Sequence, residues 1–325
     1  MRVLIVKTSS MGDVIHTFPA VEDALAARPD IEFGWCVEEA FAGIVALHPK
    51  IRPIHRVALR RWRKNLFSLA TWREMRAFRR ELRAARYDLV LDAQGLLKSA
   101  FAARQARSPV WGLDRASARE PVASLFYARG FAVPNGLHAI ERTRRLFGQA
   151  LGYAPDLTKL GSGIVPPASG YIAPPGTRTA FLLHGASRDD KKWSIVEWQA
   201  VATACLARGL TPLVTWSNDA ERQVAYSIAA VPGVTIIPKS PLPEIAGALG
   251  RSALAIGVDT GLTHLAAAFG VPTVAVFLST EPGLTGPRGA YASSLAAEPG
   301  KPVRAQDAMD EAEKLMAARG RGLAG

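Results

Sequence analysis

Short apolar runs alternate with longer amphipathic stretches through the first half of the chain. The runs that we interpret as strands are VLIV (3–6), IEFGWCV (31–37), IHRVAL (54–59) and DLVLDAQG (88–95). The stretches between them space their apolar residues as helices do, and the two longest run from about Val14 to Ala27 and from about Leu66 to Arg86. This alternation predicts a parallel sheet with helices on both of its faces.

The same alternation starts again after a stretch rich in Pro and Gly, GIVPPASGYIAPPGT (163–177). The predicted strands of the second half are AFLLHG (180–185), LTPLVTW (210–216), SALAIGV (252–258) and TVAVF (273–277). We therefore predict two doubly wound, Rossmann-like α/β domains, with residues 1–160 in the first, 161–177 as a linker and 178–305 in the second. We also predict a final helix within 306–325. It packs either on the second domain or back on the N-terminal domain.

Length and composition fit a two-domain protein of a reducing compartment. With 325 residues, the chain is too long for a single ordinary core. It has two cysteines, Cys36 and Cys205, which are too few for a disulfide framework. Lys7 interrupts the apolar start before a secretory signal can form, and polar residues break the apolar stretch 253–278, so no membrane span is predicted. We expect a cytoplasmic protein.

The net charge of +12 comes mostly from one segment of the chain. Between Leu59 and Arg86 there are ten Lys and Arg residues against two acidic ones, which leaves +8 in that segment. Such a local excess predicts an anionic partner, namely nucleic acid, an acidic membrane surface or a phosphorylated substrate. Its densest part is RRWRK (60–64). This cluster could bind phosphate or carboxylate groups, bind nucleic acid, or simply be a solvated surface.

The loop KTSSMGDVIH (7–16), after the first predicted strand, carries Asp13 at the start of a helix. One interpretation is a helix cap, because a carboxylate in the first turn stabilises a helix. The other is a general base, because a carboxylate at a strand end beside a cleft accepts a proton from an attacking hydroxyl. The residues alone leave both interpretations open.

The loop HGASRDDKKW (184–193) places two lysines, Lys191 and Lys192, after a strand of the second half. Lysines in such a loop are commonly solvated surface residues. As functional groups, their ammonium ions would neutralise a diphosphate and stabilise its departure. Both interpretations stay open at the level of the sequence.

The loop VDTGLTH (258–264) joins a buried strand to a helix. Thr260, Gly261 and the free N–H groups of the helix start would form an anion site. Asp259 and His264 are either ligand contacts or, respectively, a helix cap and a packed helix residue. Ligands bind at the carboxyl ends of strands in open α/β sheets, so the three loops together predict a binding cleft between the two domains.

Other classes of function are less well supported. Neither G-x-G-x-x-G nor G-x-x-x-x-G-K-[ST] follows the first strand, which counts against a nucleotide-dependent Rossmann oxidoreductase and a P-loop protein. The oxidoreductase stays an alternative. A nucleic-acid-binding protein would explain the charge but not the three loops. No cluster of His, Cys, Asp and Glu has metal-ligand spacing, so no metal is predicted.

Six stretches of the chain resemble the heptosyltransferases of glycosyltransferase family 9. They are MRVLIVKTSSMGDVIHTFPA (1–20), RRWRK (60–64), DAQGLLKSA (92–100), AREPVASLFY (118–127), SRDDKKW (187–193) and VDTGLTHLAAA (258–268). The resemblance extends over both halves of the chain. The N-terminal stretch, RRWRK and AREPVASLFY favour the member that adds the first heptose to the lipopolysaccharide inner core, with the second heptosyltransferase as the alternative.

The resemblance implies a GT-B fold, in which two Rossmann-like domains face a central cleft. It also implies an inverting, metal-independent glycosyl transfer that needs no cofactor. The donor would be ADP-L-glycero-β-D-manno-heptose and the acceptor Kdo2-lipid A. The protein would associate peripherally with the anionic, cytoplasmic face of the inner membrane and would not bind nucleic acid.

The resemblance also implies roles for individual residues. Asp13 would be the base on the Kdo hydroxyl, and Lys191 would contact the phosphates or the heptose of the donor, with Lys192 as the alternative lysine. The other donor-binding residues would be Ser187, Glu221, Asp259, Thr260, Gly261 and His264. The anionic groups of the acceptor would be held by Arg60, Arg61, Arg63, Lys64 and Arg119.

Overall fold

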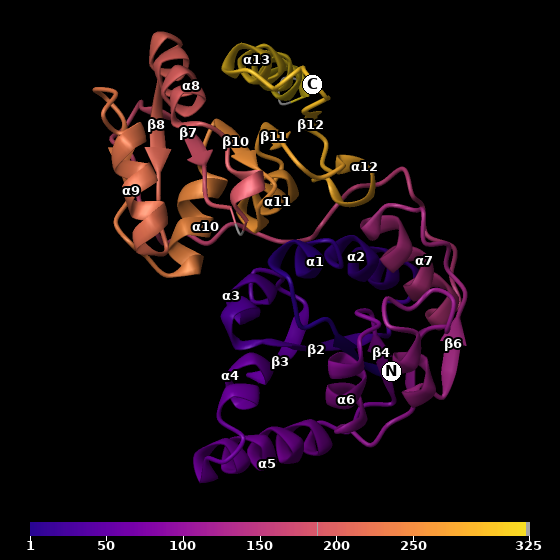
Figure 1. Ribbon diagram of the computed structural model, residues 1–325. Helices are drawn as coiled ribbons and strands as arrows, with labels where there is room; N and C mark the ends of the chain where they lie inside the picture. Colours follow the sequence, from indigo (N-terminus) through magenta and orange to yellow (C-terminus); the bar gives the residue numbers. More distant parts are fainter. Residues whose placement is uncertain (187, 323–325) are drawn as a thin grey trace. The chain divides into compact units, whose positions relative to one another are not determined.

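The structure is a computed structural model that describes residues 1–186 and 188–322. It divides into two compact units, unit 1 from Met1 to Ile164 and unit 2 from Val165 to Gly325. Each unit is built around its own six-stranded sheet with helices packed on it (Figure 1). The α/β class predicted from the alternating apolar runs is thereby confirmed.

The sheet of unit 1 is parallel throughout. Its strands are β1 (Arg2–Val6), β2 (Glu32–Glu38), β3 (Ile51–Val57), β4 (Leu89–Asp92), β5 (Val110–Leu113) and β6 (Arg129–Phe131). They lie in the order β3-β2-β1-β4-β5-β6, which is the 3-2-1-4-5-6 order of Rossmann-like sheets. The winding reverses between β1 and β4, so the loops after these two strands border the crevice where such sheets bind ligands.

The helices of unit 1 connect these strands. They are α1 (Met11–Ile15), α2 (Phe18–Ala27), η1 (Glu39–Phe41), α3 (Ala42–Val45), α4 (Leu59–Lys64), α5 (Leu69–Ala84), α6 (Leu97–Arg104), η2 (Pro121–Phe126) and α7 (Ala139–Leu151), where η marks a 3-10 helix. Side chains alternate along β1, and Leu4 and Val6 share a buried core with Phe78 of α5 and Ala102 of α6. Val3 and Ile5, also fully buried, point to the opposite face.

The two longest predicted helices differ from the helices in the structure. The stretch from Val14 to Ala27 is divided into α1 and α2, because Pro19 in the first turn of α2 has no backbone N–H to continue the preceding turn. The stretch from Leu66 to Arg86 begins later, since Ser68 has an extended backbone and α5 starts at Leu69. RRWRK instead forms most of the separate helix α4.

Unit 2 repeats the strand order of unit 1. Its strands are β7 (Arg178–Leu183), β8 (Leu210–Val214), β9 (Thr235–Ile236), β10 (Leu254–Val258), β11 (Thr273–Phe277) and β12 (Ala292–Ala296). They are parallel in the order β12-β11-β10-β7-β8-β9, which is again 3-2-1-4-5-6 when numbered within the unit and read from the β9 edge. The switch point of this sheet therefore lies between β7 and β10.

The helices of unit 2 are η3 (Asp189–Lys191), α8 (Ile195–Ala207), α9 (Asp219–Ile228), α10 (Leu242–Gly250), α11 (Gly261–Ala268), α12 (Pro282–Thr285) and α13 (Ala305–Gly322). The last helix, α13, packs against α8 and against β10, β11 and β12. Its Met309 and Ala312 belong to the same buried core as Val201 of α8 and Val274 of β11. Within residues 1–186 and 188–322, no helix is long and apolar enough to cross a lipid bilayer.

Candidate functional site

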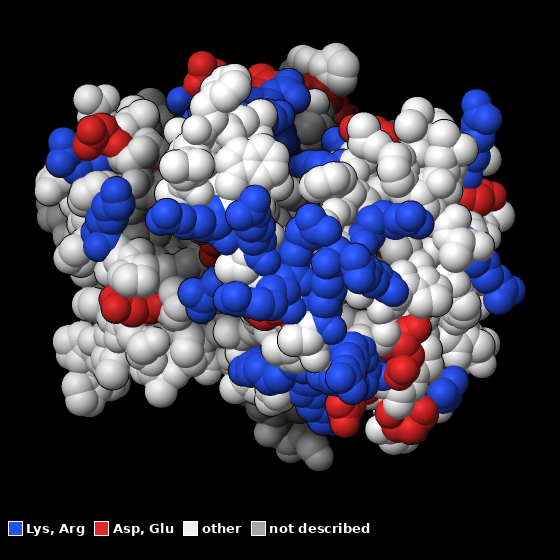
Figure 2. All heavy atoms as spheres, turned by 90° about the horizontal axis from the view of Figure 1, so that it is seen from below, with Lys and Arg blue, Asp and Glu red and all other residues white. Residues whose placement is uncertain are grey.

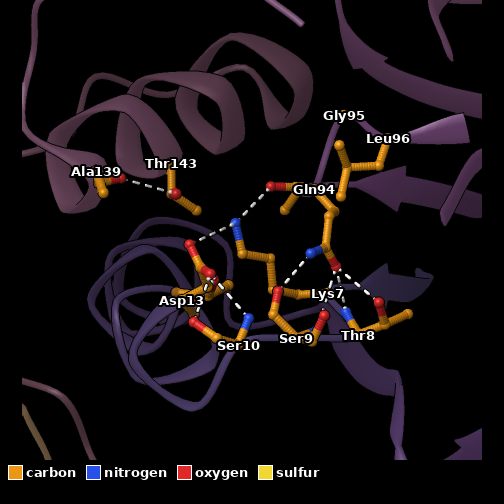
Figure 3. A network of polar contacts seen from close by, with 12 residues as sticks. Lys7, Thr8, Ser9, Ser10, Asp13, Gln94, Gly95, Leu96, Ala139 and Thr143 are labelled. Carbon is orange, nitrogen blue, oxygen red and sulfur yellow. Dashed lines mark hydrogen bonds and ion pairs between the residues drawn. The ribbon is translucent and has the colours of Figure 1, made fainter. Parts of the chain in front are cut away.

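Asp13 lies at the switch point of unit 1, in the first turn of α1 (Figure 3). Ser10 is the N-cap of this helix, and its backbone N–H and its hydroxyl each donate a 2.8 Å hydrogen bond to Asp13 Oδ2. The capping interaction that the sequence suggests is therefore present. Both bonds end on the same oxygen, so capping does not occupy the other carboxylate oxygen, Oδ1.

Lys7 stands beside that second oxygen. Its ammonium nitrogen is 3.9 Å from Asp13 Oδ1 and donates a 3.0 Å hydrogen bond to the carbonyl of Ala93. The Lys7 side chain is 11% exposed. Burial lowers the pKa of Lys7, although the negative charges of Asp13 and Asp92 act in the opposite direction. Sequence reasoning missed Lys7 as a site residue, although a cation directly after a buried strand was a visible signal.

The charge state of Asp13 follows from these neighbours. Burial by itself would raise the pKa of Asp13. The ammonium of Lys7, the two hydrogen bonds from Ser10 and the more distant charge of Arg119 outweigh that effect and hold the pKa below the ordinary value of an aspartate. The side chain is 32% exposed. Asp13 is therefore an ionised carboxylate at neutral pH that solvent can reach.

Gln94 fastens the loop that precedes Asp13 (Figure 3). Its carbonyl oxygen accepts hydrogen bonds from the N–H of Thr8 at 2.6 Å, the hydroxyl of Thr8 at 2.8 Å and the N–H of Ser9 at 3.3 Å. Its amide nitrogen donates back to the carbonyl of Ser9. One side chain after β4 thus connects both strands at the switch point. The sequence analysis placed Gln94 at a strand end but did not identify it as a site residue.

Asp92, the last residue of β4, holds Gln94 in turn. Its carboxylate accepts hydrogen bonds from the backbone N–H groups of Gln94 and Gly95 and from the hydroxyls of Ser99 and Tyr127. Asp92 is fully buried. Burial raises its pKa although these hydrogen bonds favour the ionised form. Because Asp92 is enclosed, it positions Gln94 and does not contact a ligand.

In unit 2, Lys191 and Asp259 bring the two strand-end loops of the switch point together. Lys191 follows β7 and Asp259 follows β10, and the Lys191 ammonium donates a 2.5 Å hydrogen bond to Asp259 Oδ2. The hydroxyl of Thr280 donates to the same oxygen at 3.0 Å. Nε2 of His264 lies 3.7 Å from Asp259 Oδ1. The side chains of Lys191, Asp259 and His264 are 16%, 15% and 7% exposed.

Asp259 is more than a helix cap. Thr260, and not Asp259, is the N-cap of α11, while the Asp259 carboxylate is engaged by side chains. The contact with His264 lowers the pKa of Asp259 most, burial opposes it, and the bonds from Lys191 and Thr280 lower it further, to well below the usual range. Asp259 is thus ionised at neutral pH, and its carboxylate holds the Lys191 ammonium in place.

The two lysines of the loop 184–193 differ in their surroundings. Lys191 is largely enclosed, whereas the Lys192 side chain is 47% exposed. Lys192 pairs at 2.6 Å with Asp189, which is 94% exposed and three residues earlier. Such a pair at the surface contributes little free energy. The geometry therefore favours Lys191 as the functional lysine of this loop.

The start of α11 lies directly beside this ion pair in the sequence. Thr260 has an extended backbone and its side chain makes no capping bond, and the helix begins at Gly261. The first N–H groups of a helix attract anions, especially where no side chain caps them. His264 is a buried residue of this helix. Ser187, which the resemblance also places at the donor, lies outside the described residues.

Glu221 lies in the first turn of α9, after β8. Its Oε2 accepts hydrogen bonds from the N–H and the hydroxyl of Ser217, at 2.8 and 2.7 Å, and its own N–H donates to Asn218. A Cβ added at Gly185, after β7, would be 3.2 Å from Glu221 Oε1. Glu221 therefore lies beside the end of β7, and its Oε1 faces Gly185. A side chain at position 185 would crowd this oxygen.

The basic residues predicted for the acceptor fall into two places of unit 1. Arg119 is an exposed residue after β5, and its charge acts on both Asp13 and Lys7. The others, Arg60, Arg61, Arg63 and Lys64, are exposed on α4, after the edge strand β3. Among these four, Arg61 is already paired with Glu39 and Glu74, at 3.1 and 2.9 Å.

Among the described residues, no three His, Cys, Asp or Glu side chains are grouped so that they could hold a metal ion. The polar groups of the two switch points instead include hydroxyls, an amide, the imidazole of His264, two ammonium groups and the carboxylates of Asp13, Asp92 and Asp259. Lysines and helix N-termini bind phosphate without a metal. Metal independence stays a prediction.

Comparison with known proteins agrees with this arrangement. The sequence model of the family described as Glycosyltransferase family 9 (heptosyltransferase) matches residues 75–313. Lipopolysaccharide heptosyltransferase 1 of Pseudomonas aeruginosa is 46% identical over 89% of this chain and 82% of its own length. Among solved structures, the E. coli heptosyltransferase WaaC with ADP is 39% identical, with a TM-score of 0.89 over 97% of this chain and all of that one.

A second structure of the E. coli enzyme, with ADP-2-deoxy-2-fluoro heptose, has a TM-score of 0.86 at 38% identity, over 97% of this chain and 99% of that one. This likeness confirms the predicted fold class, a two-domain α/β protein of the GT-B type. It also removes the nucleotide-dependent oxidoreductase as an alternative. The chain belongs to glycosyltransferase family 9, the family of the heptosyltransferases.

Proposed function

We propose that this glycosyltransferase moves L-glycero-D-manno-heptose from ADP-heptose to Kdo2-lipid A, as the first heptosyl transfer of the lipopolysaccharide inner core. The relative with 46% identity is named for the first heptosyltransferase, which supports this step over the second. The observation that carries the proposal is the pairing of Lys191 with Asp259 beside the start of α11. This arrangement offers positive charge to a diphosphate leaving group.

On the donor side, the C1–O bond between heptose and diphosphate breaks, and ADP carries away the electron pair. Lys191 and the N–H groups at Gly261 would bind the phosphate oxygens as their negative charge develops. Asp259 would keep Lys191 in position, with Thr280 and His264 fixing the carboxylate. Glu221 would accept hydrogen bonds from the ribose hydroxyls through Oε1, with Thr260 close to the phosphates. The donor role of Ser187, which lies outside the described residues, rests on the resemblance alone.

On the acceptor side, a hydroxyl of Kdo attacks the anomeric carbon from the face opposite ADP, which inverts the configuration. The hydroxyl proton passes to Asp13, and the new bond joins C1 to the Kdo oxygen. The lowered pKa of Asp13 ensures that the base is ionised before the reaction begins. Gln94 would act as a positioning residue, because it fixes the loop that carries the base.

The acceptor carries carboxylates and phosphates, which suit exposed guanidinium and ammonium groups. Arg60, Arg63, Lys64 and Arg119 would bind these groups directly. Arg61 is held by Glu39 and Glu74. It would therefore order α4 rather than bind the acceptor while these pairs persist. Because Kdo2-lipid A is a membrane lipid, the enzyme would work at the cytoplasmic face of the inner membrane as a peripheral protein.

The proposal is tested by offering the purified protein ADP-heptose with Kdo2-lipid A and detecting the glycolipid product by mass spectrometry. We expect one heptose to be added, and the rate to persist in excess EDTA, since cationic side chains take the place of a metal. An acceptor that already carries the first heptose should not be extended. Extension of that acceptor alone would assign the second transfer, and activity that depends on added Mg²⁺ would refute the metal-free mechanism.

Replacing Lys7 by Met should shift the pH dependence of transfer. A base must be ionised to act, so kcat/KM falls as the pH drops through the pKa of Asp13 in the free enzyme. Lys7 helps to hold that pKa down, so its removal should let the pKa of Asp13 rise. The acid limb of kcat/KM should therefore move to higher pH.

The matched control for this shift is Lys98→Met. The Lys98 ammonium bonds the hydroxyl of Ser9 in the same loop, at 3.2 Å, but is not among the main charges acting on Asp13. Its removal should leave the acid limb in place. If Lys7→Met lowered the rate equally at every pH, the observed limb would belong to another group, and Asp13 would not be the titrating base.

A further inference from the structure

The turn between α4 and α5 exposes large apolar side chains in close succession. Phe67 is fully exposed and Leu69 is 75% exposed, while Leu66 and Trp72 are about half exposed. The indole N–H of Trp72 donates a 2.8 Å hydrogen bond to the carbonyl of Leu66, which connects the first turn of α5 to the preceding residues. Single exposed apolar residues are normal in soluble proteins, but a cluster of this kind marks an interaction surface.

Helix α6 and the 3-10 helix η2, which contact each other, extend the same surface. Phe101 of α6 is 54% exposed, and Leu125 of η2 is 74% exposed. A pocket of about 320 Å³ joins α6 to α5, and its walls include Trp72, Met75 and Phe101. The exposed apolar residues of the α4–α5 turn, α6 and η2 therefore belong to one continuous surface of unit 1.

Exposed basic residues without an acidic partner in the described part of the chain lie on the same two helices, α4 and α5. The two acidic residues of the segment 59–86 are already engaged, Glu74 by Arg61 and Trp62, and Glu81 by His55. No carboxylate within the described residues pairs with the exposed basic residues Arg63, Lys64, Arg73, Arg76, Arg79 and Arg80. The view onto α5 from below shows Lys and Arg side chains gathered into one broad patch (Figure 2). We call this combined surface the apolar–basic face.

We propose that the apolar–basic face docks on an anionic lipid bilayer and inserts Phe67, Leu69 and Trp72 among the lipid chains. Arginines beside the exposed apolar side chains can reach lipid phosphates while those side chains sink below the headgroups. Positive charge attracts the protein to the anionic surface, and apolar insertion then holds it there at salt concentrations that screen charge. The pocket lined by Trp72, Met75 and Phe101 offers apolar space for a lipid chain.

Two other occupants fit this face less well. A second copy of the chain would bring two strongly basic surfaces against each other, and like charges oppose that contact. Nucleic acid would satisfy the arginines, but Leu66, Leu69 and Leu125 have neither charge nor aromatic rings for phosphates or bases. A bilayer satisfies both the charge and the apolar side chains of the face.

This inference rests on the membrane association in the proposed function. It adds which surface of the protein binds the bilayer and which interactions hold the protein there. It is nevertheless tested without any transfer reaction. The parent protein and the double variant Phe67→Ser/Leu69→Ser are mixed with vesicles of equal parts phosphatidylglycerol and phosphatidylcholine, and bound protein is measured by sedimentation. Vesicles of phosphatidylcholine alone, a DNA duplex and the oligomeric state in solution are measured in parallel.

The control variant is Ile172→Ser/Val196→Ser, which removes two apolar residues of unit 2 with similar exposure, 70% and 72%. The parent and the control should bind anionic vesicles alike, and both should bind phosphatidylcholine poorly. The variant at Phe67 and Leu69 should lose about 30-fold or more in vesicle affinity, because it keeps the charge and loses apolar insertion. All three proteins should melt at similar temperatures, since these side chains are mostly exposed to solvent.

Equal vesicle binding by the parent and Phe67→Ser/Leu69→Ser would overturn the proposal, as would absence of binding by the parent. Loss of a dimer in the variant would assign the face to a second copy, and tight binding to DNA that exceeds binding to vesicles would assign it to nucleic acid. Transfer to a water-soluble acceptor without acyl chains should be unchanged in the variant. Failure of that reaction in the parent would count against the proposed function, and not against docking.

Discussion

Asp13→Asn is expected to yield a folded, donor-binding protein whose heptosyl transfer is slower by roughly 10²–10⁴-fold, the usual contribution of a positioned general base. The amide oxygen of Asn can still accept the hydrogen bonds that Ser10 donates to Asp13 Oδ2. Asn also caps helices about as well as Asp. The free energy of unfolding should therefore change by no more than about 1 kcal/mol.

The loss of rate follows from the chemistry of the side chain. A neutral amide cannot take the proton of the attacking hydroxyl, and it places an N–H₂ group where Asp13 Oδ1 faces the Lys7 ammonium. Ser10→Ala is the matched control. It removes one hydrogen bond to the same carboxylate but keeps the base, so turnover near pH 7 should stay within a few-fold of the parent.

The measurements are turnover with ADP-heptose and Kdo2-lipid A, donor affinity by calorimetry and unfolding by urea, on the parent and both variants. An Asn variant with near-normal turnover would leave Asp13 as a helix cap only. An Asn variant that failed to fold would be replaced by Asp13→Ser in the same comparison. Unchanged turnover in that folded variant would exclude Asp13 as the base.

Lys191→Met is expected to slow transfer by about 10²–10³-fold, whereas Lys192→Met should cost less than about fivefold. The neighbours differ in their surroundings rather than in their chemistry. Lys191 is 16% exposed and held at 2.5 Å by Asp259, while Lys192 is 47% exposed and paired with a residue that is almost fully exposed. A preorganised ammonium stabilises developing charge on a diphosphate more strongly where water is largely excluded.

Single-turnover rates of the two variants with ADP-heptose separate this effect from product release. Lys191→Met should also weaken the binding of ADP, because the diphosphate loses a cation. The reverse ranking of the two lysines would move the donor role to Lys192 and leave the bond between Lys191 and Asp259 a purely structural one. Equal and small effects would indicate that the start of α11 carries the diphosphate without help from either lysine.

The elements that could be predicted from the sequence are those that a local pattern encodes. The runs VLIV and SALAIGV are continuous apolar segments, and β1 and β10 are fully buried parallel strands apart from Arg2 at the exposed end of β1. The polar residues that follow them are placed at a strand end by the chain itself. Local pattern therefore suffices to identify Asp13 and Asp259 as candidate site residues.

Contacts between distant segments could not be predicted in this way. The bonds of Gln94 to Thr8 and Ser9 join residues more than eighty positions apart, and they depend on β4 lying beside β1. The pairing of Lys191 with Asp259 needs the same knowledge for β7 and β10. The sequence shows Phe67 only as an apolar residue near a basic helix, since its full exposure depends on the turn between α4 and α5.

The repeated strand order has a consequence for how this enzyme can be re-engineered and how its family diversified. Each half is a complete Rossmann-like module with its own sheet, and the chain passes from one to the other between Ile164 and Val165. Residues assigned to the nucleotide sugar all follow β7, β8 or β10. If the proposed roles hold, donor preference can drift by mutation, or be exchanged by recombination at that junction, without altering the loop that carries Asp13. Inheritance in modules would let one acceptor-binding half, as proposed above, be combined with many activated sugars.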